Sequence, residues 1–214
     1  MPNKTIRFSR TMLLGVIFYL SALSSYAQSD FSVEAISDSV FSVMQGKSFP
    51  EGCTVRRADL RYLTVRHYDA KGQVHTGHLV CNQLIADDLV DIFRKLYEAR
   101  YPIERVQLID DFDADDERSM AANNTSCFCY RSIQGSKKLS KHAQGLAIDI
   151  NPLYNPCVKD LSVQPRNGRR YADRARTFTY KIVKGDLLWR LFTEHGFIWG
   201  GSWRSLKDWQ HFEK

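Results

Sequence analysis

The sequence lacks several patterns that would assign it directly to a familiar class. It has no internal repeat and no polybasic block with interleaved aromatic residues, and the second absence argues against a nucleic-acid partner. None of its six histidines stands in an H-E-x-x-H motif, which excludes the commonest helix-borne zinc peptidase site. With 43% hydrophobic and 25% charged residues, the 214-residue chain has the composition of an ordinary folded protein and the length of one domain.

Long apolar runs are also scarce, and the one near the N-terminus is short. Residues 12–23 follow three basic residues and precede small residues at Ser25 and Ala27. Because a membrane-spanning helix needs ~20 apolar residues, this pattern favours a secretory signal peptide cleaved after Ala27 over an uncleaved anchor. We therefore expect a signal peptide at 1–27, a single domain at 28–214 and export to the periplasm or the extracellular space.

Cleavage at this position has two further consequences. The residue directly after the cleavage site is Gln28 and not a cysteine, so we expect neither a lipid anchor nor any other stable membrane attachment. The loss of three basic residues lowers the formal net charge from +6 to +3, a mild bias that is compatible with an anionic polymer as substrate.

All five cysteines lie in the mature part of the chain. In an oxidising compartment we expect two disulfides and one free thiol, without a pairing that the sequence can assign. Cys127 and Cys129 lack the two-residue spacer of metal and redox motifs, so a structural role is favoured over a functional pair.

The first half of the mature chain predicts a helix and a hairpin. Apolar residues at helical spacing predict a helix over 31–44 that closes at Gly46. In residues 60–81, strand-like segments with alternating residue types flank a Lys71-Gly72 turn signal, and this pattern predicts a β-hairpin.

A strong amphipathic helix is predicted after the hairpin. Asn82 is placed to cap it, Pro102 follows its end, and residues 103–109 predict a buried strand. The expected apolar face of this helix consists of Leu84, Ile85, Leu89, Ile92, Phe93 and Leu96.

The acidic segment 110–126 has no apolar period and predicts a long solvated loop. Its alternating aspartates suggest an EF-hand. However, Asp116 stands where that loop needs glycine and Ala122 where it needs the bidentate glutamate, so an EF-hand is excluded.

The second half shows strands without regular alternation with helices. Residues 127–132 and 146–151 predict strands, 152–177 predict an irregular excursion, and Asp186 is placed to cap a short helix that ends at Gly196. Two strand-like pieces close the chain. We expect an α+β fold with a largely antiparallel sheet and flanking helices.

Four of the histidines need no functional explanation. His67, His75 and His78 lie among polar residues of the hairpin and are expected to face solvent. His195 ends a helix, where a cation interacts favourably with the helix dipole.

His142 and Asp149 are harder to explain structurally, because Asp149 stands between two isoleucines on a predicted strand. A carboxylate buried there is costly unless it is paired, hydrogen-bonded or bound to a metal. A catalytic zinc site uses three protein ligands and keeps one position open, and His211 in the aromatic "DWQHFE" is the natural third ligand.

These segments resemble the M15 metallopeptidases of peptidoglycan metabolism. "SKHAQGLAID" resembles the family's S-x-H-x-x-G-x-A-x-D signature, and "FIWGGSWRSLKDWQHFE" resembles its closing W-G-G-x-W and D-x-x-H-F segment. "YRS" at 130–132 is similar to an upstream element. The resemblance covers 130–213 and implies a Hedgehog/DD-peptidase-like α+β fold.

The resemblance also implies the roles of the site residues. His142, Asp149 and His211 would bind one Zn²⁺ per chain, and Asp208 would act as the catalytic base. Arg131 would face the developing oxyanion or a substrate carboxylate, with an ion pair to the acidic segment 110–117 as the structural alternative.

Three neighbouring residues are expected to support this site. Ser140 would brace the loop that carries His142, and Gly145 would allow a close approach of the backbone. Glu213 is either a hydrogen-bond partner of a ligand histidine or a solvated terminal residue.

The implied activity is hydrolysis of a bond in peptidoglycan stem peptides by a cell-wall-associated, exported monomer. The bond is either D-Ala-D-Ala or L-Ala-D-Glu, and the D-x-x-H spacing leans towards the endopeptidase branch, since the carboxypeptidase branch usually carries glutamate there. Ser202 departs from the W-G-G-D-W of many endopeptidase relatives, which leaves efficiency and specificity open.

Two other functions compete with this one. The first is an inactive zinc-containing module that binds peptidoglycan, because a fold does not determine a function. The second is a thiol redox protein built on Cys127 and Cys129, which would show a titratable thiol and no dependence on metal.

Overall fold

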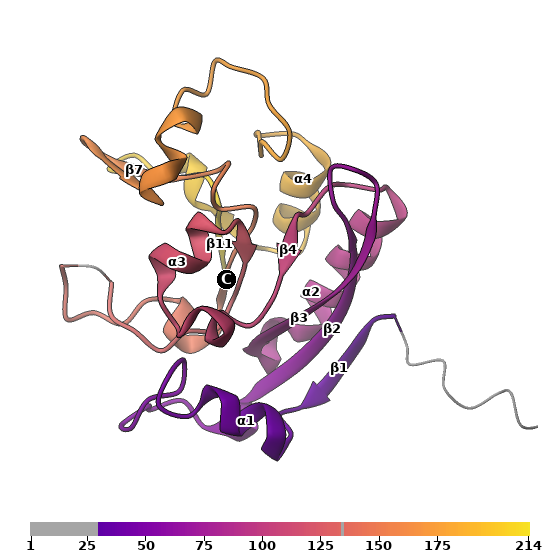
Figure 1. Cartoon of the computed structure of the whole chain (residues 1–214), viewed down its shortest axis with the longest axis vertical. Helices are drawn as coiled ribbons and strands as arrows, with labels where there is room; N and C mark the ends of the chain where they lie inside the picture. Colours follow the sequence, from indigo (N-terminus) through magenta and orange to yellow (C-terminus); the bar gives the residue numbers. More distant parts are fainter. Residues whose placement is uncertain (1–29, 134) are drawn as a thin grey trace, which may run out of the picture. The chain divides into compact units, whose positions relative to one another are not determined.

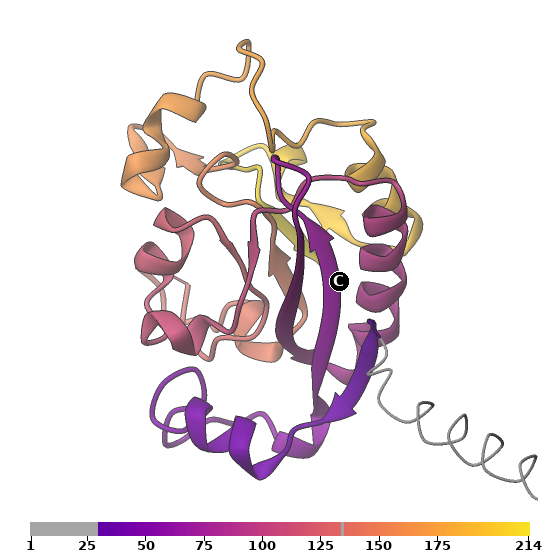
Figure 2. The same cartoon turned by 45° about the vertical axis from the view of Figure 1, so that its right-hand side comes forward.

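The computed structural model describes residues 30–133 and 135–214, and Phe31–Lys214 forms one unit with its own core. The expected signal peptide at 1–27 lies outside the described residues. Within them, no helix combines the length and the apolar character that a membrane crossing requires. Mostly antiparallel sheets and a few helices make up the unit (Figures 1 and 2), so the expected α+β class is confirmed.

The predicted hairpin is confirmed. β2 (Leu60–Tyr68) and β3 (Val74–Asn82) pair antiparallel, and β1 (Ser32–Ala35) adds to the free edge of β2. The expected helix over 31–44 is wrong in its first half, because β1 takes backbone hydrogen bonds from the sheet instead. Only α1 (Asp38–Met44) is helical, and it starts where the Ser37 hydroxyl accepts a bond from the Val40 amide.

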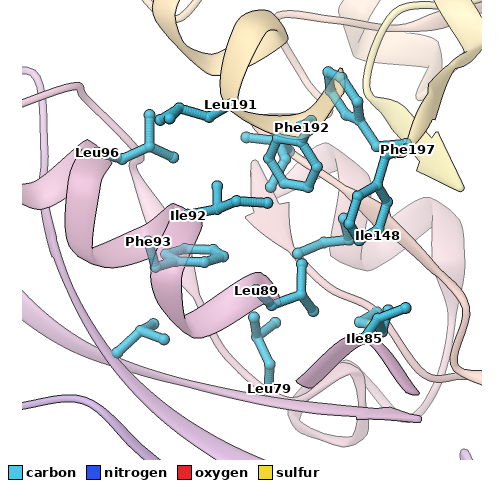
Figure 3. Close-up of a cluster of buried hydrophobic side chains, with 14 of the residues drawn as sticks. Leu79, Ile85, Leu89, Ile92, Phe93, Leu96, Ile148, Leu191, Phe192 and Phe197 are labelled. Atoms are coloured by element: carbon cyan, nitrogen blue, oxygen red, sulfur yellow. The ribbon is translucent and has the colours of Figure 1, made fainter. Parts of the chain in front are cut away.

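The amphipathic helix is confirmed as α2 (Gln83–Glu98), and the Asn82 side chain accepts a hydrogen bond from the Leu84 amide at its first turn. Leu84 itself is 72% exposed, so its expected place on the buried face is wrong. Figure 3 shows the remaining apolar face of α2 directed at side chains of α4 (Leu187–Glu194), at Phe197 and at Ile148. This core supports the strand that carries Asp149.

Three small sheets complete the unit. β6 (Ala147–Asp149), β11 (His211–Glu213) and β9 (Ile198–Trp199) form one antiparallel sheet in the order β6-β11-β9. β10 (Lys207–Asp208), β7 (Cys157–Lys159) and β8 (Ser162–Gln164) form another in the order β10-β7-β8. β4 (Arg105–Val106) and β5 (Asn124–Thr125) pair in parallel.

Short helices lie between these strands. One is the α-helix α3 (Asp116–Ala121), and the 3-10 turns are η1 (Arg57–Asp59), η2 (Ile109–Phe112), η3 (His142–Gln144), η4 (Arg166–Tyr171) and η5 (Gly200–Ser202). The short helix capped by Asp186 is confirmed as α4, since the Asp186 carboxylate accepts a bond from the Trp189 amide.

Several local predictions in the middle of the chain are wrong. The expected solvated loop 110–126 contains α3 and β5, and Asp110 is buried because its carboxylate accepts bonds from the amide and hydroxyl of Ser48. Residues 103–109 and 127–132 contribute little regular strand, because their backbone bonds go to scattered partners. The excursion 152–177 contains a small hairpin, β7–β8, followed by η4.

The expectation of two disulfides is also wrong, because all five cysteines are free thiols. Cys81 and Cys127 belong to the main core cluster, and Cys129 is buried as well. These three cysteines therefore behave as small apolar core residues rather than as cross-links.

Candidate metal centre

The three expected ligands come from two strands and one turn. Asp149 ends β6 and His211 begins β11, and the two residues are direct partners in the antiparallel register. Directly opposed residues on adjacent strands place their side chains on the same face of the sheet. His142 opens η3, the turn that leads into β6, which brings it to the same place from the other side.

The ligand atoms converge. His211 Nδ1 lies 3.0 Å from Asp149 Oδ1, His142 Nε2 lies 3.3 Å from the same oxygen, and the two nitrogens are 3.1 Å apart. Tetrahedral ligands at zinc distances of about 2.0–2.1 Å stand roughly 3.3 Å from one another. The three side chains therefore already have nearly the spacing that a tetrahedral ion requires, and they form a group that could hold a metal ion.

In each ligand histidine, the ring nitrogen that points away from the centre has a hydrogen-bond partner, and this partner determines which nitrogen carries the proton. His142 Nδ1 lies 2.7 Å from the Cys127 carbonyl, which only accepts, so Nδ1 carries the proton and Nε2 presents a lone pair. His211 Nε2 donates to the Glu213 carboxylate at 3.2 Å, which leaves Nδ1 as the nitrogen that faces the other two ligand atoms and that binds a metal when the ring is neutral. With both imidazoles neutral, two lone pairs and a carboxylate oxygen face one another, and a bound cation would replace the proton that His211 Nδ1 otherwise donates to Asp149. A cation at their centre would satisfy all three.

The electrostatics of the centre also favour a cation. Burial lowers the pKa of His211, but its hydrogen bonds to Asp149 and Glu213 outweigh burial and raise that pKa to about 10. The carboxyl of Asp149 is buried, which alone would raise its pKa, yet His142 and His211 hold the pKa well below its usual range. The carboxylates thus create a strongly negative potential around the two imidazoles.

The turn that carries His142 has the features expected of Ser140 and Gly145. The Ser140 hydroxyl accepts a hydrogen bond from the His142 amide at 3.2 Å. Gly145 has a φ of 68°, and a Cβ there would lie 2.6 Å from the backbone nitrogen of Asn82. Only glycine fits this left-handed position and this close approach, which joins the ligand turn to the start of α2.

The metal centre opens into a cleft of about 800 Å³ whose wall also includes Asp208, Arg131, Trp203 and Glu213. The Asp208 Oδ1 atom is buried and has no hydrogen-bond partner among the described residues. Burial, followed by the negative charge of Asp149, raises the pKa of Asp208 to about 6. Asp208 therefore has a free buried acceptor atom in the cleft that contains the three ligand side chains.

Gly200 shows how near Asp208 lies to the ligand His211. A Cβ on Gly200 would be 2.9 Å from the Cβ of Asp208 and 3.3 Å from that of His211. The two side chains therefore flank the same point on η5, and the glycine of "WGGSW" makes room for both.

Arg131 forms an ion pair with Asp116, the first residue of α3. This is the structural alternative that the sequence left open. Both residues also line the cleft, so the pairing holds the guanidinium at the cleft wall. The functional role implied for Arg131 by the resemblance stays a prediction.

The remaining histidines lie away from this centre. His67 is buried rather than solvent-facing, because its Nδ1 donates to the Ile103 carbonyl at 2.6 Å, so that expectation is wrong. His75 and His78 are partly exposed, and His195 at the end of α4 contacts Asp88 and Asp91.

Some residues of the site went unnoticed in the sequence. The Cys127 carbonyl cannot be recognised from a residue type, because any residue supplies one. Trp203, whose ring centre lies 5.2 Å from that of His211, had a signal in its place within the closing motif. Cys157 also lines the cleft, and its register opposite Asp208 depends on a pairing that only the fold establishes.

Residues 134–214 match the model of an M15 peptidase family described as D-alanyl-D-alanine carboxypeptidase. No curated protein and no solved structure matches the chain. The matched part contains His142, Asp149, Asp208 and His211, whereas Arg131 lies outside it. The resemblance to M15 peptidases is thereby confirmed for the C-terminal part of the chain.

Proposed function

We propose that this chain, an M15 peptidase by its C-terminal part, is an exported zinc-dependent enzyme that hydrolyses peptidoglycan stem peptides. The observation that carries the proposal is the convergence of His142 Nε2, His211 Nδ1 and Asp149 Oδ1 at 3.0–3.3 Å. All three are acceptors when both imidazoles are neutral, as they are when bound to a metal, and they stand at the wall of a cleft large enough for a peptide.

His142, Asp149 and His211 would hold the ion, and two nitrogens with one carboxylate oxygen are a donor set typical of catalytic zinc. When bound, zinc makes a water molecule acidic near neutral pH and polarises the substrate carbonyl. The Cys127 carbonyl and the Glu213 carboxylate keep both imidazoles in the tautomer that binds a metal.

Asp208 is the proposed general base. Its free Oδ1 atom accepts the proton of the attacking water and later donates it to the leaving amine. A base works best when its pKa lies near the working pH, and burial moves the pKa of Asp208 upward in that direction.

Arg131 is proposed to bind the substrate carbonyl oxygen or a carboxylate of the stem peptide. Its ion pair with Asp116 fixes the guanidinium against the cleft, so less side-chain entropy is lost on binding. The guanidinium keeps further N–H groups for substrate, since one carboxylate does not use all five donors.

The bond that is cleaved remains a choice between two. The matched family is described as a D-alanyl-D-alanine carboxypeptidase, whereas the Asp208-x-x-His211 spacing leans towards an L-Ala-D-Glu endopeptidase. We further propose that the enzyme works as a monomer at the cell wall after removal of residues 1–27.

The test uses residues 28–214, which contain the whole described unit. Zinc is measured by elemental analysis, and products from purified muropeptides are identified by mass spectrometry before and after chelation. We expect one zinc per chain and a chelator-sensitive product whose mass names the bond. Absence of bound zinc would refute the assignment of the three ligands.

A single substitution separates an enzyme from an inactive binding module. Asp208→Asn should keep its zinc and lower turnover about 10²–10⁴-fold, because the base is lost while the shape is kept. Asp173→Asn, on an exposed loop, is the matched control and should keep full turnover. If the wild type binds zinc and muropeptides without product, the chain is a binding module.

A further inference from the structure

The positive charge of the chain is concentrated in one segment. Residues 157–184 contain eight lysines and arginines and only two acidic residues, Asp160 and Asp173. Their net charge of +6 equals that of the entire 214-residue chain, so the rest of the chain is balanced. No polybasic block is visible in the sequence, because these residues are spread over 28 positions. Four of them, Lys159, Arg166, Arg169 and Arg170, lie on the β7–β8 hairpin and η4, which contact each other.

Six of these basic side chains are exposed: Lys159, Arg166, Arg169, Arg170, Arg176 and Lys184. We call them the basic rim. Arg174 and Lys181 are instead engaged in the fold through hydrogen bonds to backbone carbonyls. Figures 1 and 2 show the segment, in orange, at the end of the unit opposite α1.

The side chains of the basic rim form no ion pair within the described residues, although the Glu117 carboxylate accepts a hydrogen bond from the Arg166 amide at 2.6 Å. Within residues 30–133 and 135–214, no ion pair joins a lysine or arginine of 157–184 to a carboxylate, whereas basic residues elsewhere, such as Lys47 and Arg56, do form such pairs. Unpaired exposed arginines favour a partner that carries phosphate or carboxylate groups, because the guanidinium binds both in a bidentate way.

The same element presents an apolar tip. Leu161 lies in the turn between β7 and β8 and is 89% exposed, more than any other large apolar side chain in the part of the chain that the structure describes. The Arg169 guanidinium donates to the Leu161 carbonyl at 3.3 Å, so cationic and apolar groups meet at the tip. Val183, 41% exposed, stands beside Lys184 at the other end of the segment.

We propose that the β7–β8 hairpin and η4 dock on an anionic phospholipid surface. Leu161 enters the interfacial region of the bilayer, and the basic side chains of the hairpin and η4 (Lys159, Arg166, Arg169 and Arg170) bind the phosphate groups around it. A purely ionic polymer would make no use of an exposed leucine, whereas a bilayer interface accommodates an apolar side chain ringed by cations. Docking of this kind is peripheral, and it would hold the peptidase unit at the membrane face of the wall.

The test is sedimentation of residues 28–214 with vesicles of phosphatidylglycerol and phosphatidylcholine in equal parts, and with phosphatidylcholine alone. We expect binding to the anionic vesicles only, with weakening as salt is raised. Because each lysine or arginine near an anionic surface strengthens binding about fivefold, R169A/R170A should bind roughly 25-fold more weakly. Leu161→Ser should lose about tenfold, since one interfacial leucine is withdrawn.

A matched control removes the same charge elsewhere. Arg94 and Arg100 are exposed residues of the α2 region that lie over aromatic rings, as Arg170 lies over Tyr171. R94A/R100A should change vesicle binding less than about twofold, because charges far from the contact are screened. An equal loss in both double variants would refute a localised docking surface.

Two further outcomes would overturn the proposal. One is the absence of binding to anionic vesicles at low salt. The other is binding of soluble long-chain polyphosphate that is unaffected by Leu161→Ser and displaces the vesicles, which would make the partner a phosphate polymer. Cleavage of soluble muropeptides by R169A/R170A should remain unchanged, so this test is independent of the proposed peptidase function.

Discussion

Glu213 offers the sharpest test of the metal centre. Its carboxylate accepts the hydrogen bond from His211 Nε2 at 3.2 Å, and this contact keeps Nδ1 directed at Asp149 and free to bind a metal when the ring is neutral. The hydrogen bond to His211 is also the main reason why the pKa of Glu213 lies below its usual range. Glu213 should therefore control zinc affinity although it is not itself a ligand.

The magnitude follows from what each substitution removes. Glu213→Gln removes the charge and keeps an amide oxygen that can accept the same bond, and the side chain is 25% exposed, so water screens part of the loss. Partners of this kind are worth 10–100-fold in metal affinity, and we expect about tenfold, or ~1.4 kcal/mol, for Glu213→Gln. Glu213→Ala removes both charge and acceptor and should lose about 100-fold, or ~2.7 kcal/mol.

The assay is competition for zinc with a chromophoric chelator at neutral pH. Glu194→Gln is the matched control, because Glu194 is exposed at the end of α4 and carries the same charge. We expect the order wild type and Glu194→Gln, then Glu213→Gln, then Glu213→Ala. Equal zinc affinities of the wild type and both Glu213 variants would refute the assigned tautomer of His211 and, with it, the reasoning about the donor set.

Two further predictions concern folding. Gly145→Ala should lower the free energy of unfolding by about 3 kcal/mol, because alanine is strained at a φ of 68° and its Cβ would overlap the Asn82 backbone. Chemical denaturation measures this loss, and an unchanged denaturation midpoint would contradict the close approach of Gly145 to Asn82. Burial lowers the pKa of His67 to about 4 from an ordinary value of 6.5. The neutral side chain therefore contributes to stability above pH 6.5, and this contribution is lost as the pH falls towards 4. Between pH 6.5 and pH 4 the free energy of unfolding, measured by urea titration, should fall by about 3 kcal/mol more in the wild type than in His67→Gln. If the free energies of both proteins fall in parallel with pH, the imidazole of His67 is not buried in its neutral form.

Local elements with strong signals of their own were predictable from the sequence. The β2–β3 hairpin, the Asn82 cap with α2 and the Asp186 cap with α4 are confirmed, because turn residues, caps and helical periodicity act over a few residues. The three ligand types and their order were also visible, since a lone aspartate among isoleucines needs a partner.

Long-range pairing accounts for most of the errors. Residues 31–37 have a helical period, yet 32–35 join the edge of β2, since an unpaired edge supplies backbone partners that outweigh a weak local preference. His67 is buried in a strand that looked polar, because Ile103 supplies an acceptor from a distant segment. Neither outcome has a local signal.

The sequence by itself determined which side chains could form the metal centre, because their chemistry is a property of residue type. Only the tertiary structure decided that His142 Nε2, His211 Nδ1 and Asp149 Oδ1 face one another. That geometry depends on the register of β6 with β11, on the Cys127 carbonyl behind His142 and on Glu213 behind His211. Likewise, the sequence gives the number of basic residues in 157–184, but only the fold decides that their side chains form no ion pairs, since an ion pair requires proximity that sequence distance does not reveal.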